Sequence, residues 1–203
     1  MTTIVCVRHA AHDNVGGFLA GRTPGVRLGE AGRAQAARLG RRLRGEHFDA
    51  VLTSPRERTR ETAAAICVDR GIEPQVEEDL DELDFGSWSN RTFDDLGRED
   101  DWRRWNTARW LCATPAGDTM LAVQARMVAL VMRLRGNWPD GRIVLVSHAD
   151  PIKVLLAYFL TLPLDAFHRF DIEPASVSRI QIDAWSSVVR SINEPAGREG
   201  EDP

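Results

Sequence analysis

Basic side chains follow three separate apolar runs of the sequence. Arg8 and His9 follow the first run, Arg58 lies shortly after the second, and His148 ends the third. Arginine is always charged and binds phosphate through paired hydrogen bonds. A neutral imidazole can attack phosphorus without first losing a proton, unlike a serine or threonine hydroxyl. These residue types therefore predict a site that binds a phosphoryl group, with one histidine as a candidate nucleophile and the other as a hydrogen-bond donor.

Phosphoryl transfer from an alcohol also needs an acid that protonates the leaving oxygen. The acidic stretch over residues 77–84 offers candidates, among them Asp81, Glu82 and Asp84. Spacing within the sequence does not choose between these three carboxyl groups.

The basic residues can act together only if the fold brings the three apolar runs side by side. Residues 3–7, 49–53 and 142–147 are short and rich in β-branched side chains, which is typical of buried strands. Helical patterns follow each strand, so we expect a mainly parallel sheet with helices on both faces, a three-layer α/β architecture. The carboxyl ends of parallel strands share one edge of a sheet, and ligands bind there.

The remaining patterns complete a single domain over residues 1–193. Helices are predicted over residues 30–44, 54–70, 118–135 and 151–160, with Ser54 as the N-cap of the second. Further strands are predicted over residues 75–77, 176–182 and 187–192. Residues 78–117 are predicted to form an irregular insertion over one edge, and we interpret its tryptophans as packing residues. Residues 194–203 are predicted to form a flexible tail.

Composition excludes several classes of protein. The chain has 203 residues, a formal net charge of -4 and 28% charged residues, which fits a globular domain and disfavours general nucleic-acid binding. No apolar run is long enough to span a membrane. Its three cysteines are widely spaced, so we expect neither disulfides nor a cysteine-rich zinc site, and Cys6 is expected to be buried. A cytoplasmic protein is the expectation, as a monomer or homodimer.

Arginine is unusually frequent, since Lys153 is the only lysine among 26 basic residues. For most of these arginines we favour a coding bias as the reason. Arg8 and Arg58 differ from the other arginines because each follows a predicted strand, at the same edge of the sheet as a histidine. The others that could hold an anionic part of a substrate are Arg22, Arg91, Arg103, Arg104 and Arg109.

Five motifs in order resemble the histidine phosphatases, also called the phosphoglycerate mutase-like superfamily. They are RHA (8–10), LGEAGRAQA (28–36), SPRERTRETA (54–63), ELDFGSW (82–88) and VSHA (146–149). Two departures are that Ala10 and Ala149 replace the glycines that usually follow the two histidines. Asn14 lies one residue before the position at which many members of the family have an asparagine. His12 is expected at the mouth of the pocket.

The resemblance implies a role for each matching residue. His9 would be the nucleophile and pass through a phosphohistidine. Arg8, Arg58 and His148 would bind the phosphoryl group, and Glu82 would act as general acid and then as general base. Further predicted substrate contacts are Ala149, Asn14 and Arg22. No metal and no cofactor are implied.

The expected function is hydrolysis of a small phosphorylated metabolite, without nucleic acid or membrane as partner. The alternative within the family is a phosphoglycerate mutase-type phosphomutase, although dedicated mutases usually carry a larger covering insertion. A metal-dependent hydrolase is a second alternative, with His9, His12, His148 and Asp150 as ligands. A third is a phosphate-binding module without turnover, which Ala10 and Ala149 motivate.

Overall fold

A six-stranded sheet forms the centre of the computed structural model, which describes residues 1–13 and 15–197. The strand order is β3-β2-β4-β1-β5-β6. The strands are β1 (Thr2–Arg8), β2 (Ala50–Thr53), β3 (Gln75–Val76), β4 (Arg142–Ser147), β5 (Val177–Ile182) and β6 (Ser187–Glu194). β1 to β4 are mutually parallel, whereas β5 runs antiparallel to β1 and to β6. The predicted, mainly parallel sheet is confirmed.

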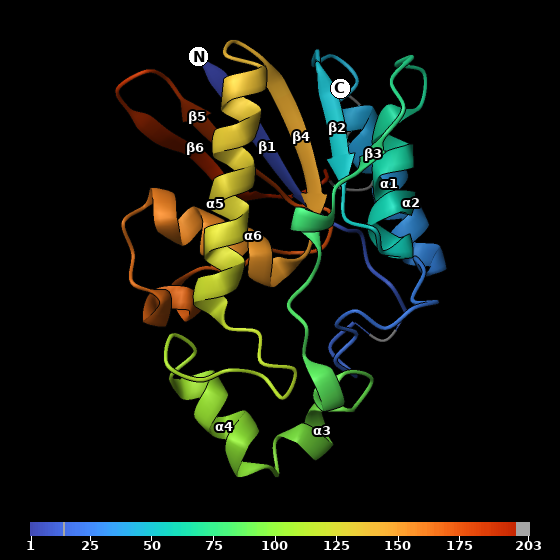
Figure 1. Ribbon diagram of the computed structural model, residues 1–203. Coiled ribbons are helices and arrows are strands. Elements are labelled where there is room, and N and C mark those ends of the chain that lie inside the picture. The colour runs from blue at the N-terminus through green and yellow to red at the C-terminus, as the bar shows by residue number, and fades with distance from the viewer. Residues whose placement is uncertain (14, 198–203) are drawn as a thin grey trace.

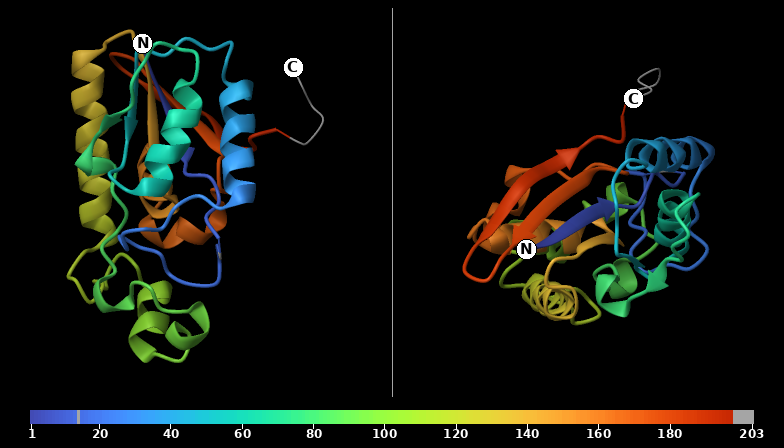
Figure 2. Two further views of the ribbon diagram at one scale, coloured as in Figure 1. Left: turned by 90° about the vertical axis from the view of Figure 1, so that its right-hand side faces the viewer. Right: turned by 90° about the horizontal axis from the view of Figure 1, so that it is seen from above.

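Helices cover both faces of this sheet (Figure 2). The helices α1 (Glu30–Arg42) and α2 (Glu57–Cys67) lie on one face, and α5 (Met120–Asn137) and α6 (Ala149–Phe159) lie on the other. Successive strand residues point to opposite faces, so Val5 packs toward α1 and α2 while Ile4 packs toward α5 and α6. Both side chains are fully buried. The three-layer α/β expectation is therefore confirmed.

The insertion between β3 and α5 lies beyond the carboxyl ends of β2 and β4 (Figure 1). It contains two 3₁₀ turns, η1 (Glu78–Leu80) and η2 (Gly86–Trp88), and the short helices α3 (Phe93–Leu96) and α4 (Asp100–Thr107). Trp88 contacts Trp102 and Trp105 edge to face, with ring centroids 5.2 Å and 5.9 Å apart. These three tryptophans are packing residues, as predicted, whereas Trp110 is 53% exposed.

The start of α2 differs from the prediction. The helix begins at Glu57 with Arg56 as its N-cap, so Ser54 does not cap it. Instead the backbone N–H of Ser54 donates to the Val146 carbonyl at 3.0 Å and extends the β2–β4 pairing. The prediction used only local spacing, and this pairing joins residues far apart in the sequence. A further 3₁₀ segment, η3 (Leu164–Arg169), was not predicted.

The last strand extends through Glu194, one residue beyond the predicted domain boundary. The Glu194 carboxylate pairs with Arg42 of α1 and, at 2.5 Å, with Arg179 of β5. Residues 198–203 of the predicted tail lie outside the described residues.

Candidate active site

Three strand-to-helix junctions meet at one edge of the sheet. Arg8 pairs in register with Ser147, which places His9 beside His148. The ring centroids of these two histidines are 5.2 Å apart. Arg58, on the first turn of α2, reaches both rings: its Nε lies 3.2 Å from His9 Nε2 and its Nη2 lies 3.0 Å from His148 Nδ1. The structure thus brings together four of the predicted site residues.

Hydrogen bonds determine which ring nitrogen of His9 carries the proton. Nδ1 lies 2.8 Å from the Ala10 carbonyl oxygen, which can only accept, so Nδ1 is the protonated nitrogen. Nε2 accepts a hydrogen bond from Arg58 Nε and therefore carries a lone pair and no proton. Burial, with the positive charges of Arg58 and Arg8, holds the pKa of His9 well below its ordinary value of 6.5. The ring is neutral at neutral pH and suited to nucleophilic attack through Nε2.

A chain of hydrogen bonds orients His148. Its Nδ1 accepts from Arg58, so its Nε2–H donates to Ser54 Oγ at 2.8 Å. The Ser54 hydroxyl in turn donates to Asp81 Oδ1 at 3.2 Å. Arg56 fixes that carboxylate with two hydrogen bonds of 2.8 Å and 2.7 Å. Sequence reasoning missed Ser54 and Asp81 as supports of the site, because neither spacing nor motif links them to His148.

The two site arginines retain free donors. Arg8 Nη1 donates to the Ile172 carbonyl at 2.5 Å, while its buried Nε has no hydrogen-bond partner among the described residues. Arg58 is 1% exposed, and its Nη1 is likewise buried without a partner there. Buried donors without acceptors are costly, so these two arginines are suited to binding an anion. The N-terminus of α6, at Ala149, adds backbone N–H groups to this edge.

Glu82 lies next to these groups, with Oε2 4.0 Å from His148 Nδ1. Its Oε1 accepts from the Leu83 backbone N–H at 2.9 Å. Burial and the nearby charge of Asp150 raise the pKa of Glu82 to about 8, against the opposing effect of Arg58. At neutral pH the group therefore holds a proton that it can donate.

The other two acidic candidates are placed differently. Arg56 holds the Asp81 carboxylate in two hydrogen bonds, and the Asp84 side chain is 41% exposed and 3.6 Å from Arg22. The geometry thus favours Glu82 as the acid, a choice that spacing alone left open.

Arg22 is held by acidic groups rather than free in the pocket. Its Nε donates to the Glu82 carbonyl at 2.8 Å, and its guanidinium pairs with Asp81, Asp84 and Asp118 at 3.3 to 3.6 Å. A direct substrate contact by Arg22 stays a prediction. Asn14, a further predicted substrate contact, lies outside the described residues.

The two alanines that replace glycines fit their positions. Neither Ala10 nor Ala149 has a positive φ, so both adopt conformations that are ordinary for alanine. Ala10 is fully buried, and its N–H donates to Thr62 Oγ1 at 3.0 Å. His12 follows, and its ring centroid lies 6.0 Å from that of His9. The backbone therefore gives no reason to expect lost turnover.

Helix α1 supports the loop after His9 through a close backbone approach. A Cβ on Gly32 would lie 1.7 Å from the Ala11 carbonyl oxygen, so only glycine fits there. Gln35, one turn later, accepts from the Ala11 N–H at 3.0 Å and donates to the Pro174 carbonyl at 2.9 Å. These contacts hold the residues around His9 between α1 and the segment before β5.

Asp150 and Arg109 form a further charged pair at the site. Arg109 Nη1 lies 3.2 Å from Asp150 Oδ2, and the two side chains are 11% and 15% exposed. The guanidinium lies 3.8 Å above the Trp105 ring and 4.2 Å from the Phe167 ring. Arg109 was one of several undecided arginines in the sequence, and Asp150 was considered only as a metal ligand. Across the described residues, no group of three or more His, Cys, Asp and Glu side chains is arranged to hold a metal ion.

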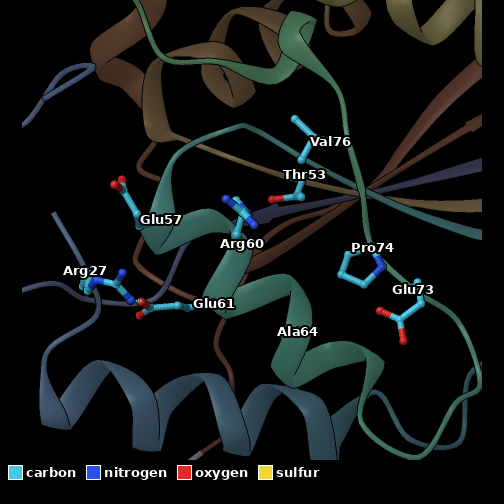
Figure 3. Close-up of a pocket in the computed structure, with 9 residues that line it drawn as sticks. All are labelled: Arg27, Thr53, Glu57, Arg60, Glu61, Ala64, Glu73, Pro74 and Val76. Atoms are coloured by element: carbon cyan, nitrogen blue, oxygen red, sulfur yellow. Dashed lines mark hydrogen bonds and ion pairs between the residues drawn. The ribbon is translucent and has the colours of Figure 1, made fainter. Parts of the chain in front are cut away.

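A separate cavity of about 410 Å³ runs along α2 and the β2–β3 edge (Figure 3). Its charged side chains are largely engaged with the chain itself. Glu57 accepts from the Gly25 N–H, and Glu61 accepts from the Leu28 N–H and pairs with Arg27. The cavity contains none of the converging histidines, so the chemistry belongs to the sheet edge.

Comparison with known proteins agrees with this geometry. The family model described as histidine phosphatase superfamily (branch 1) matches residues 4–195. The chain belongs to the histidine phosphatase superfamily. Phosphoserine phosphatase 1 of Hydrogenobacter thermophilus is 28% identical over 95% of this chain and 92% of its own length. An adenosylcobalamin/alpha-ribazole phosphatase of Salmonella typhimurium is 32% identical over 94% of this chain and 95% of its own.

Among solved structures, YhfR of Bacillus stearothermophilus superposes with a TM-score of 0.89 at 28% identity, covering 96% of this chain and 98% of that one. The fold is thus phosphoglycerate mutase-like, and the protein is an enzyme of the histidine phosphatase type.

Proposed function

We propose that this protein hydrolyses small phosphomonoesters through a phosphohistidine formed on His9. One observation carries the proposal: the unprotonated Nε2 of buried His9 lies against Arg58, whose Nη1 has no partner in the described chain. An anion that fills this pocket brings its phosphorus to the nucleophilic nitrogen.

In the first step, the His9 Nε2 lone pair attacks phosphorus and the ester P–O bond breaks. The proton of Glu82 passes to the leaving oxygen, which departs as the alcohol. Arg8 and Arg58 balance the charge on the equatorial oxygens. A direct bond from His148 to the phosphoryl group stays a prediction, since its Nε2–H donates to Ser54 and its Nδ1 accepts from Arg58. A phosphoryl dianion also provides an acceptor for the arginine donors that lack one.

In the second step, the Glu82 carboxylate takes a proton from water, and the water oxygen attacks phosphorus. The P–N bond breaks, phosphate leaves, and both His9 and Glu82 return to their starting protonation states. One group thus serves as acid and then as base, which suits a pKa of about 8.

The names of the two relatives, phosphoserine phosphatase and alpha-ribazole phosphatase, support hydrolysis of a small phosphorylated metabolite. No observation at the site favours the phosphomutase alternative. None of the described helices is both long and apolar enough to cross a bilayer. The cytoplasmic location stays a prediction, which the three free cysteines support. The oligomeric state, monomer or homodimer, also stays a prediction.

The test is to trap the intermediate. We expect wild type, quenched during turnover of a labelled phosphomonoester, to carry acid-labile, base-stable phosphate on His9. His9→Ala should lose both the label and turnover, by at least about 10³-fold. The matched control is His47→Ala, since His47 is an 83% exposed histidine far from the site. Turnover that survives in His9→Ala, or wild type that never carries label, would rule out the proposed mechanism.

A further inference from the structure

The candidate general acid lies on a segment without regular secondary structure. Glu82 falls between the 3₁₀ turns η1 and η2, so neither strand pairing nor a helix fixes its backbone. Its N–H donates to Asp81 Oδ1 at 2.9 Å, and its carboxyl oxygen Oε1 accepts from the Leu83 N–H at 2.9 Å. The place of its carboxyl group therefore depends on the side chains that bind this segment.

Arg126 of α5 binds the segment through its backbone. Its Nη1 donates to the Asp79 carbonyl at 2.5 Å, and its Nη2 donates to the carbonyls of Asp81 and Glu82, the latter at 3.2 Å. One planar guanidinium thus bonds three carbonyl oxygens within four residues. These bonds are partly buried, which makes them stronger than the same bonds in water.

A second arginine reaches the carbonyl of the candidate acid. The Glu82 carbonyl also accepts from Arg22 Nε at 2.8 Å. Arg22 belongs to the segment before α1, and its guanidinium is itself held by Asp81, Asp84 and Asp118. Two charge-assisted bonds on one carbonyl oxygen restrict both its position and its direction.

Arg133 lies seven residues after Arg126, on the same face of α5, and makes different contacts. It pairs with the carboxylates of Glu77 and Asp79 at 2.7 Å and 3.1 Å. Both bonds go to exposed side chains rather than to the backbone. The helix thus presents two arginines to one segment, and Arg126 is the one that bonds the backbone of Glu82.

We propose that Arg126 is a positioning residue, which holds the Glu82 carboxyl where it protonates the leaving oxygen. The inference rests on the proposed function, in which Glu82 is the acid. Removing Arg126 should impair proton transfer but leave the attack by His9 unchanged. Arg56 holds the Asp81 carboxylate on its own, so the chain of bonds that orients the second histidine is retained. The loss should therefore appear only with leaving groups that need a proton.

Two esters that share a nitrophenyl ring separate these effects. The phenolate of p-nitrophenyl phosphate leaves without a proton, whereas the alkoxide of p-nitrobenzyl phosphate needs one. The measure is kcat/KM, because it ends at release of the alcohol and excludes the later step in which Glu82 acts as base. In Arg126→Met we expect kcat/KM to fall at least about tenfold for the p-nitrobenzyl ester and less than about twofold for the p-nitrophenyl ester.

Two further variants sharpen the test. Arg133→Met is the matched control and should leave both values unchanged. Arg126→Lys keeps the charge, but a single nitrogen cannot bond three carbonyls, so the selective loss should persist. An equal loss for both esters, no loss in Arg126→Met, or a wild-type ratio in Arg126→Lys would overturn the inference.

Exchange of the Leu83 amide proton, followed by NMR, needs no turnover. That proton is bonded to Glu82 Oε1, so it should exchange at least about fivefold faster in Arg126→Met than in wild type or Arg133→Met. If p-nitrophenyl phosphate is not hydrolysed, or if its hydrolysis survives in His9→Ala, the proposed function fails. Exchange at Leu83 then decides the inference separately, and an unchanged rate in Arg126→Met would overturn it.

Discussion

At the residue scale, Arg58 connects the two histidines of the site. One guanidinium donates to His9 Nε2, to His148 Nδ1 and, at 2.7 Å, to the Gly21 carbonyl. These bonds specify the tautomers of both rings. An arriving phosphoryl group competes for the same donors, so Arg58 must redistribute its hydrogen bonds as the substrate binds. A lysine, with a single nitrogen, could not make this arrangement.

Glu82 should set the alkaline limit of activity. Burial and Asp150 raise its pKa to about 8, so the proton-donating form is lost as pH rises through that value, and kcat with an alkyl phosphate should fall. Asp150→Asn removes one cause of the raised pKa of Glu82, so the alkaline limb of the pH profile, where kcat falls, should move to lower pH. A pH profile of kcat for both proteins measures the shift.

Two further variants complete this test. Glu82→Gln should lose the limb and about 10²–10³ of the rate on an alkyl phosphate, because no acid protonates the leaving oxygen. Asp100→Asn should leave the limb in place. A limb that persists in Glu82→Gln would assign the titration to another group.

At the scale of elements, Arg109 joins the insertion to the core. It lies just beyond α4, pairs with Asp150 of α6 and stacks on Phe167 of η3. Arg109→Leu keeps an apolar side chain between the rings but leaves Asp150 without its cation. We expect a loss of about 3 kcal/mol in the free energy of unfolding, since one partner of a buried pair is removed.

Urea denaturation measures that loss, and hydrogen exchange over residues 100–112 locates it. Arg103→Leu, which removes a surface pair with Asp100, is the matched control and should leave stability unchanged. Equal stabilities of the two variants would contradict a joining role for Arg109.

The sequence predicted the elements better than their polar connections. β4 was predicted over its observed span because it is buried on both faces and reads as an uninterrupted apolar run. Ser54 was misplaced as a helix cap because its partners, Asp81 and His148, lie 27 and 94 residues away. Five ordered motifs pointed to His9 and His148, but only the fold shows that Ser54 and Asp81 support the His148 ring.

At the scale of the whole molecule, an ion-pair network connects three parts of the chain. Arg179 of β5 pairs with Glu46 after α1 at 2.8 Å and with Glu194 of β6 at 2.5 Å. Arg179→Met should cost about 1–2 kcal/mol of unfolding free energy, because two partly exposed pairs are lost together. Urea denaturation at low and high salt should show the loss shrinking as salt screens the charges.

Arg104→Met, which removes one exposed pair with Asp101, should show no such loss. A cost for Arg179→Met that does not change with salt would assign the effect to packing of its side chain rather than to charge.

The strand order has a consequence for how the protein is made. β1 leaves the ribosome first, yet its neighbours in the sheet are β4 and β5, the nearer of which begins at Arg142. An apolar strand that leads into His9 thus stays unpaired until the residues up to Ser147 have been synthesised. Long-range pairing of this kind is slow and leaves the nascent chain open to aggregation. The candidate catalytic edge therefore assembles only after β4 has been synthesised, and chaperones have a long interval in which to hold the unpaired strand.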